Sequence, residues 1–297
     1  MPATEANGIL ICYEAMGDPA DPTLLLVMGL GCQLVEWDEP LCQKLVEHGF
    51  HVLRYDNRDV GLSTKMDDAP VPDLLALAGG DASSASYTVE DMADDAAGLL
   101  EALDIERAHV VGASMGGMIA QALAIRHPDR VASLCSIMST TGAPDVGQPS
   151  AEAVTALLQP PGETREEAIE ANVVLNRVIG STGFPFDEAA VRERAARAYD
   201  RDHSSAGVTR QAAAILASPD RTERLHAVRV PTVVIHGEAD PLIHPSGGEA
   251  TARAVPGARL ITVPGMGHDL PEETWPLLLE AVLANAERAG FKAAASP

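Results

Sequence analysis

Positive charge is scarce in this chain. Its 297 residues include 21 Lys and Arg against 43 Asp and Glu, which leaves a formal net charge of −22. A field of that sign repels nucleic acid and anionic membranes, so the composition argues against both as partners. No apolar run reaches the roughly 18 residues of a membrane-spanning helix, and no charged-then-apolar leader is present. We therefore expect a cytoplasmic protein.

Cysteine is also sparse, and its distribution argues against a metal site. The sequence contains four cysteines, Cys12, Cys32, Cys42 and Cys135. Their spacing is not that of metal ligands, and no secretion signal accompanies them, so we interpret them as free thiols in a reducing compartment. Nothing in the sequence indicates a bound metal or an organic cofactor.

One stretch joins a strand pattern, a serine motif and a helix pattern in direct succession. An apolar run at residues 108–112 leads into Gly-x-Ser-x-Gly centred on Ser114, and a helical pattern follows over residues 118–125. So sharp a turn forces strained dihedral angles on its central residue, and Gly112 and Gly116 supply no Cβ to clash with the helix or the next strand. The serine hydroxyl is then held at a helix N-terminus, which favours developing negative charge. This context predicts a nucleophilic serine.

A nucleophilic serine needs a base, and the base needs an acid to orient it. Asp240 follows a β-branched run at residues 232–237, and His268 follows another at residues 259–263. Both lie just past predicted strand ends, where open α/β sheets place their ligands. The order along the chain, serine then acid then histidine, is the one found with a serine in this kind of strand-to-helix turn. His244 is the rival base.

Glu238 and Asp269 are the rival acids. Asp269 is adjacent to His268 in sequence, and sequence neighbours usually direct their side chains elsewhere. Glu238 stands at the very end of its predicted strand, where its side chain can face the flank of the sheet. We therefore place the acid at Asp240.

A glycine-rich turn at residues 28–31 follows a predicted strand and precedes a helical segment. Such a turn can direct a backbone N–H to the same point as the N–H of Met115, the residue after the nucleophile. Two amides of this kind form an oxyanion hole, in which each donor contributes roughly 3–4 kcal/mol to acyl transfer. The alternative is an ordinary strand–helix connection.

Apolar strand runs alternate with helical patterns, which is typical of a mostly parallel sheet with helices on both faces. We expect strands near residues 8–13, 23–28, 51–55, 108–112, 133–138, 232–237 and 259–263. Residues 141–228 contain only helical patterns, at 151–158, 164–179, 187–200 and 205–217. The expected organisation is an α/β core, residues 1–140 and 229–297, with a helical cap at 141–228 over the serine.

Methionines and a few aromatic residues lie near the predicted active edge. Met28, Met115, Met118, Met138 and Met266 fall at or beside its loops, where methionine suits either an adaptable pocket or simple core filling. Aromatic residues make up only 3% of the chain, so Trp37, Phe184 and Phe186 stand out. Each could form a pocket wall or dock the cap on the core. The candidate pocket residues are Met28, Trp37, Met138, Phe184, Phe186 and Met266. The run at residues 55–59 is interpreted as a structural turn in which Asp–Arg pairing supports neighbouring loops.

These blocks resemble the α/β-hydrolase superfamily over residues 8–283. LLLVMGLG, HVLRYDNRDVGLST, AHVVGASMGG, STGFPFDE, VPTVVIHGEADPLI and VPGMGHDLP are similar to blocks of aclacinomycin methylesterases and of many bacterial esterases. The resemblance implies Ser114 as nucleophile, Asp240 as acid and His268 as base, with Leu30 and Met115 as oxyanion donors. Two departures are local: Met28 precedes Gly29 where much of the superfamily has His, and residues 32–37 have no close match.

The expected protein is a serine hydrolase that cleaves a small-molecule carboxylic ester through an acyl-enzyme, without a cofactor. Perhydrolase or haloperoxidase chemistry and C–C bond hydrolysis use the same triad and remain alternatives. A ligand-binding protein that keeps the fold without turnover is the alternative from another class. Ser114 excludes dehalogenase and epoxide hydrolase chemistry, because both need an aspartate at this position of the strand-to-helix turn. Oligomeric state stays open.

Overall fold

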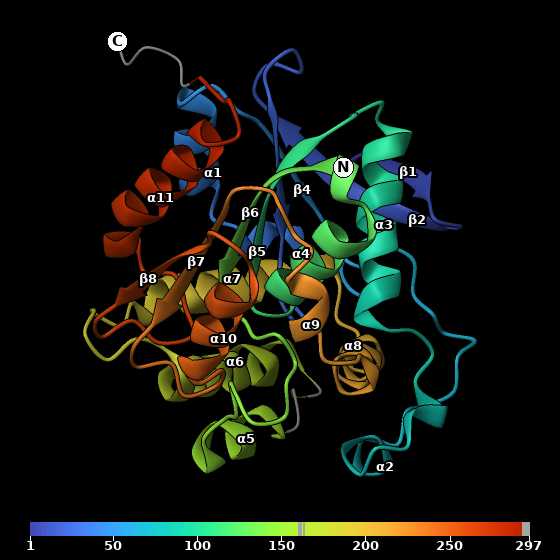
Figure 1. The fold of residues 1–297 in the computed structure, drawn as a ribbon. Helices are drawn as coiled ribbons and strands as arrows, with labels where there is room; N and C mark the ends of the chain where they lie inside the picture. Colours follow the sequence, from blue (N-terminus) through green and yellow to red (C-terminus); the bar gives the residue numbers. More distant parts are fainter. Residues whose placement is uncertain (160–161, 163, 293–297) are drawn as a thin grey trace.

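A single eight-stranded sheet organises the chain (Figure 1). The computed structural model describes residues 1–159, 162 and 164–292. The strands are β1 (Ala3–Ala6), β2 (Ile9–Met16), β3 (Thr23–Val27), β4 (His51–Tyr55), β5 (Ala108–Ala113), β6 (Val131–Ile137), β7 (Thr232–Gly237) and β8 (Arg259–Val263). Their order is β1-β2-β4-β3-β5-β6-β7-β8, parallel throughout except for the β1-β2 and β2-β4 pairs. The expected mostly parallel sheet is confirmed.

All seven expected strands are present, with ends that differ from the expected ones by at most three residues. The strand β1 was not among those predicted. This strand has four residues, of which one is buried, so it has no apolar run to mark it. It exists because β2 offers it a partner, with Ala3 opposite Cys12.

Helices cover both faces of the sheet. They are α1 (Glu39–Glu47), α2 (Leu74–Ala78), α3 (Val89–Ala102), α4 (Met115–Arg126), α5 (Ala151–Leu157), α6 (Arg165–Ile179), α7 (Glu188–Arg201), α8 (Ser205–Ala217), α9 (Thr222–Leu225), α10 (Ser246–Ala254) and α11 (Trp275–Glu287). Short 3-10 helices lie at Leu34–Glu36, Ala82–Ser84, Pro128–Arg130 and Glu272–Thr274.

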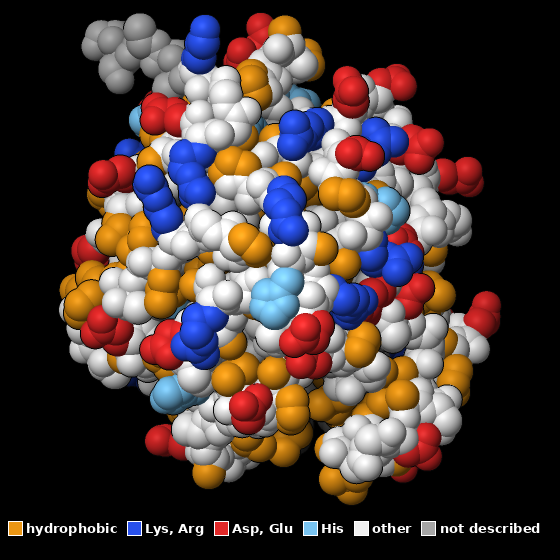
Figure 2. All heavy atoms as spheres, viewed as in Figure 1, with side chains coloured by type: hydrophobic (Ala, Val, Ile, Leu, Met, Phe, Trp, Pro, Cys, Tyr) orange, Lys and Arg blue, Asp and Glu red, His pale blue; other side chains and the backbone are white. Residues whose placement is uncertain are grey.

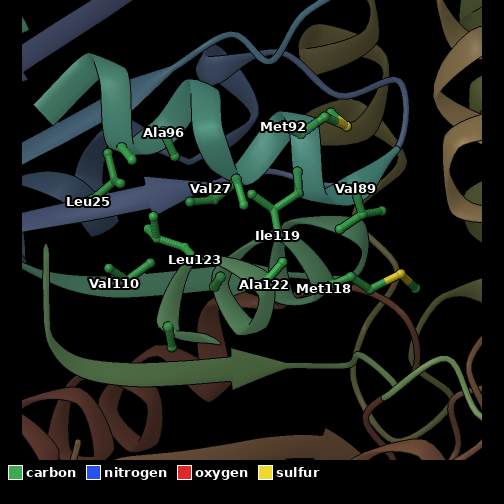
Figure 3. Close-up of a cluster of buried hydrophobic side chains, with 14 of the residues drawn as sticks. Leu25, Val27, Val89, Met92, Ala96, Val110, Met118, Ile119, Ala122 and Leu123 are labelled. Carbon is green, nitrogen blue, oxygen red and sulfur yellow. The ribbon is translucent and has the colours of Figure 1, made fainter. Parts of the chain in front are cut away.

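Side chains that alternate along the strands supply one core on each side of the sheet. Leu25 and Val110 pack with α3 and α4 (Figure 3). Leu24 and Val111 point to the opposite face and pack with α1 and α11. Central strands such as β3, β4, β5 and β7 are buried along their whole length. This explains why they appear in the sequence as continuous apolar runs.

The helices α5 to α8 follow β6 along the chain, and α5, α6 and α8 lie in the lower part of Figure 1. Each starts at a side chain that accepts a hydrogen bond from a backbone N–H of the first turn: Ser150, Thr164, Asp187 and Ser204. Such N-caps satisfy amides that the helix itself leaves unpaired. These local signals explain why the four expected helices agree with the structure to within one residue at each end. No strand occurs among the described residues between 141 and 228.

Two expectations from the sequence concern the whole molecule. All four cysteines are free, as expected. Among residues 1–159, 162 and 164–292, no helix is both long and apolar enough to cross a membrane. On the face that Figure 2 shows, acidic and basic side chains are interspersed with hydrophobic ones.

Candidate active site

Ser114 lies in a strained turn between β5 and α4. Its φ of 57° and ψ of −122° put a residue with a Cβ in a region that such residues rarely adopt. A Cβ on Gly112 would lie 2.1 Å from the carbonyl oxygen of Gly116, and one on Gly116 would lie 2.1 Å from that of Val27. Both flanking glycines are therefore required by close backbone approach. The side chain of Ser114 stands at the N-terminus of α4, as the motif predicted.

Strand order brings distant loops to this serine. The C-terminal ends of parallel strands share one edge of a sheet, and β3, β5, β6, β7 and β8 are consecutive neighbours. The loop after β7 carries Asp240 and the loop after β8 carries His268. His268 Nε2 lies 2.9 Å from Ser114 Oγ, and His268 Nδ1 lies 2.8 Å from Asp240 Oδ2. A carboxylate only accepts, so Nδ1 carries the proton and Nε2 is free to accept the serine hydroxyl.

Asp240 is held in the ionised form. Burial by itself would raise its pKa, but hydrogen bonds from His236 and His268 outweigh that effect and lower the pKa to about 2. The other carboxylate oxygen, Oδ1, accepts from the backbone amides of Leu242 and Ile243, each at 2.9 Å. His236 is fully buried behind the loop, where its Nε2 lies 2.8 Å from the carbonyl oxygen of Ile243.

The rival groups have other partners. Glu238 accepts from the hydroxyl of Thr262 at 2.8 Å on the surface. Asp269 accepts from the hydroxyl of Ser181. His244 is exposed, and its Nδ1 lies 3.0 Å from Ser246 Oγ.

The glycine-rich turn after β3 runs directly beside the serine. A Cβ on Gly29 would lie 3.1 Å from Ser114 Cβ and 3.5 Å from Ser114 Oγ. The amide of Cys32 donates to the carbonyl of Gly29 at 3.2 Å and closes a four-residue turn. Within the described part of the chain, the amides of Leu30 and Met115 donate no hydrogen bond that the structure records. These two amides belong to the residues that directly follow Gly29 and Ser114, and they are the donors that the sequence predicted for an oxyanion hole.

The loop that carries His268 is hydrogen-bonded to the link between α6 and α7. The amide of His268 donates to the carbonyl of Ile179 at 2.7 Å, and the amide of Gly267 donates to Ser181 Oγ at 3.0 Å. Ser181 also donates to Asp269. No local signal in the sequence indicates this role of Ser181, because its partners Gly267 and Asp269 are more than 80 positions away.

The candidate pocket residues fall mainly in one of the two cores. Met28, Trp37, Met138 and Met266 are buried in the cluster that contains α1 and α11. Phe184 packs against the same cluster from the cap segment. Phe186 instead lies against Arg177, whose guanidinium carbon is 4.6 Å from the ring centroid. Met115 and Met118, both in the first turn of α4, belong to the opposite cluster.

The run at residues 55–59 connects the core to the insertion. Its acidic side chains pair with arginines of α7 and α8, Asp56 with Arg201 at 2.9 Å and Asp59 with Arg210 at 2.7 Å. Its own arginine, Arg58, pairs with Asp95 of α3. The expected Asp–Arg pairing exists, but each pair joins the run to another element.

Comparisons with known proteins identify the family and agree with the fold. Residues 22–274 match the model of the alpha/beta hydrolase fold family. Rhodomycin D methylesterase DnrP of Streptomyces peucetius is 31% identical over 302 residues, which cover 95% of this chain and 96% of that protein. A putative carbamate hydrolase, RutD of Variovorax paradoxus, is 29% identical over 86% of this chain and 88% of its own. The crystal structure of the enol-lactonase from Burkholderia xenovorans LB400 superposes with a TM-score of 0.74 at 27% identity, covering 96% of this chain and all of that one.

Proposed function

The chain belongs to the α/β-hydrolase family, and from this premise we propose that it is a serine esterase acting on small carboxylic esters. One observation carries the proposal. Ser114 Oγ, His268 and Asp240 form a continuous relay with contacts of 2.9 and 2.8 Å, beside two backbone amides that have no acceptor recorded in the described chain. This is the arrangement that acyl transfer through a covalent intermediate requires.

In the first half of the reaction, Ser114 Oγ attacks the ester carbonyl carbon while His268 Nε2 takes the hydroxyl proton. The amides of Leu30 and Met115 stabilise the negative oxygen of the tetrahedral intermediate. Asp240 stays ionised, because its pKa of about 2 lies far below neutral pH, and it stabilises the imidazolium. His268 then donates its proton to the departing alkoxide, and an acyl ester of Ser114 remains.

The second half repeats these steps with water as nucleophile. His268 Nε2 accepts a proton from the water as its oxygen attacks the acyl carbon, and the same two amides hold the oxyanion. When the intermediate collapses, the proton returns to Ser114 Oγ and the carboxylic acid leaves. Every proton transfer passes through His268, so no metal or organic cofactor is needed for the chemistry.

The proposed substrate class rests on the names of the related proteins, which indicate the bond that they cleave. A methylesterase and an enol-lactonase both act on carboxylic esters, open in one case and cyclic in the other. We infer an uncharged or weakly charged ester with an apolar acyl part. Residues 141–228 would cover it, and Met28, Trp37, Met138, Met266, Phe184 and Phe186 would line its pocket. The net charge of −22 disfavours anionic substrates.

Replacing the nucleophile tests the proposal. Ser114→Ala should lower kcat on methyl and p-nitrophenyl esters by about 10⁴- to 10⁶-fold without changing the melting temperature. A serine-directed phosphonate should label the wild type at Ser114 alone. His268→Gln should be comparably inactive, whereas the matched change His244→Gln should leave activity intact, because the His244 side chain is exposed and its hydrogen bonds to described residues are with Ser246. Substantial activity in the Ser114→Ala variant would refute the assignment.

A further inference from the structure

A buried glutamine of α8 contacts the turn that carries Leu30. Gln211 has no exposed surface. Its Oε1 accepts a hydrogen bond of 2.8 Å from the amide of Gly31, and its Nε2 donates one of 2.7 Å to the carbonyl of Arg58. Because one partner only donates and the other only accepts, the orientation of the side-chain amide is determined. Gln211 therefore holds Gly31 from a fixed direction.

The helix that presents Gln211 is itself firmly docked. Arg210, the preceding residue, pairs with the fully buried Asp59 through two contacts of 2.7 and 3.0 Å. One turn earlier, a Cβ on Gly207 would lie 2.0 Å from the carbonyl oxygen of Asp59. Positions 207, 210 and 211 share one face of the helix, so this face of α8 is seated against the core.

The turn that receives this contact is closed by the hydrogen bond from Cys32 to Gly29, but its central peptide, Leu30–Gly31, has no recorded hydrogen bond within residues 29–32. Gly31 has a φ of 72°. Glycine adopts this angle readily, but because it lacks a Cβ it can also adopt many other backbone conformations. The Leu30–Gly31 peptide can rotate unless its N–H is held, and such a rotation shifts the adjoining Gly29–Leu30 peptide, whose N–H is the oxyanion donor. From the other side, Val208 lies against Gly31, with its Cγ2 at 3.2 Å from the position of a Cβ.

We propose that Gln211 is a positioning residue for the oxyanion hole: by holding the amide of Gly31, it keeps the amide of Leu30 directed at the carbonyl oxygen of the bound ester. The inference rests on the proposed function, because it assigns Leu30 as an oxyanion donor. It makes helix α8 of the insertion part of the catalytic framework as well as a cover for the substrate. Gln211 does not touch the substrate and acts only through the turn.

Gln211→Met tests this role, because methionine nearly matches glutamine in length but neither accepts from Gly31 nor donates to Arg58. A displaced oxyanion donor should lower kcat about 10- to 100-fold and leave KM within about threefold, since the donor acts in the transition state. The inhibition constant of a boronic acid, which forms a tetrahedral adduct with the serine, should rise by the same factor. Ser204→Ala is the matched control, because it weakens α8 by removing its N-cap without touching the turn.

If Gln211→Met does not fold, Gln211→Asn carries the test. Its amide stays polar but falls one C–C bond short of Gly31, so kcat should fall in the same direction. The inference is overturned if the folded variant keeps the kcat of Ser204→Ala, or if KM rises with kcat unchanged. Failure of the proposed function is distinguishable, because in that case wild type would lack esterase activity or Ser114→Ala would retain it.

Discussion

Asp240→Asn is the change whose consequence the structure defines most closely. The amides of Leu242 and Ile243 both donate to Oδ1. In the variant, the side-chain amide oxygen should stay with these two donors, because the side-chain NH₂ group cannot accept from them. That orientation turns the NH₂ group toward His268 Nδ1, where the carboxylate oxygen Oδ2 lies at 2.8 Å in the wild type.

The imidazole must then change tautomer. Nδ1 becomes the acceptor, the proton moves to Nε2, and the atom 2.9 Å from Ser114 Oγ can no longer take the serine proton. A comparable change in a serine protease triad lowers kcat by about 10⁴-fold. At 1.36 kcal/mol for each factor of ten, this amounts to about 5 kcal/mol of transition-state stabilisation. The fold should survive, because the substituted side chain keeps both backbone contacts.

Steady-state kinetics on one ester, with circular dichroism to check the fold, measure the effect. Glu238→Gln and Asp269→Asn are matched controls, since each removes one negative charge from a loop beside the site. Both should retain far more activity, because Glu238 contacts Thr262 and Asp269 contacts Ser181. If Asp240→Asn lowers kcat only slightly while Glu238→Gln lowers it by several orders of magnitude, the placement of the acid is refuted, although the esterase proposal would survive.

Three further predictions concern stability and specificity. Arg210→Met should lower the free energy of unfolding in urea by about 3–5 kcal/mol, because it leaves the fully buried Asp59 without its cation, and adding Asp59→Asn should recover part of the loss. The depressed pKa of Asp240, about 2 against 3.8 unfolded, contributes roughly 2 kcal/mol above pH 4, which is lost as the pH falls through 2. The wild type should therefore lose more stability than Asp240→Asn between pH 5 and pH 2 in urea titrations, and parallel losses would contradict this account. Phe184→Ala should change the chain-length preference among p-nitrophenyl esters more than it changes the rate on the acetate ester. Phe186→Ala should change that preference less, because the Phe186 ring lies against Arg177. Equal losses on all esters would indicate that these rings only dock the cap on the core.

Local patterns in the sequence were sufficient for much of the fold and for the candidate triad. The central strands are buried on both faces and so appear as unbroken apolar runs, and the cap helices begin at Ser, Thr or Asp. Ser114 was predicted as the nucleophile from the flanking Gly112 and Gly116, and the structure shows that a Cβ at either position would clash with the backbone. Asp240 and His268 were found by a topological rule, since residues after parallel strands share one edge of the sheet.

Contacts between distant segments could not be predicted in this way. Gly31 and Gln211 are 180 positions apart, and neither residue type nor spacing marks the pair. Ser181 meets Gly267 and Asp269 only because the α6–α7 link lies against the histidine loop, and β1 forms only because β2 is there to pair with it. The sequence by itself therefore determined most of the elements and the choice of the candidate triad, because backbone sterics and burial act over a few residues. Which cap side chains hold the oxyanion turn and the histidine loop was decided only by the tertiary structure, because each such hydrogen bond depends on how two separately formed elements pack.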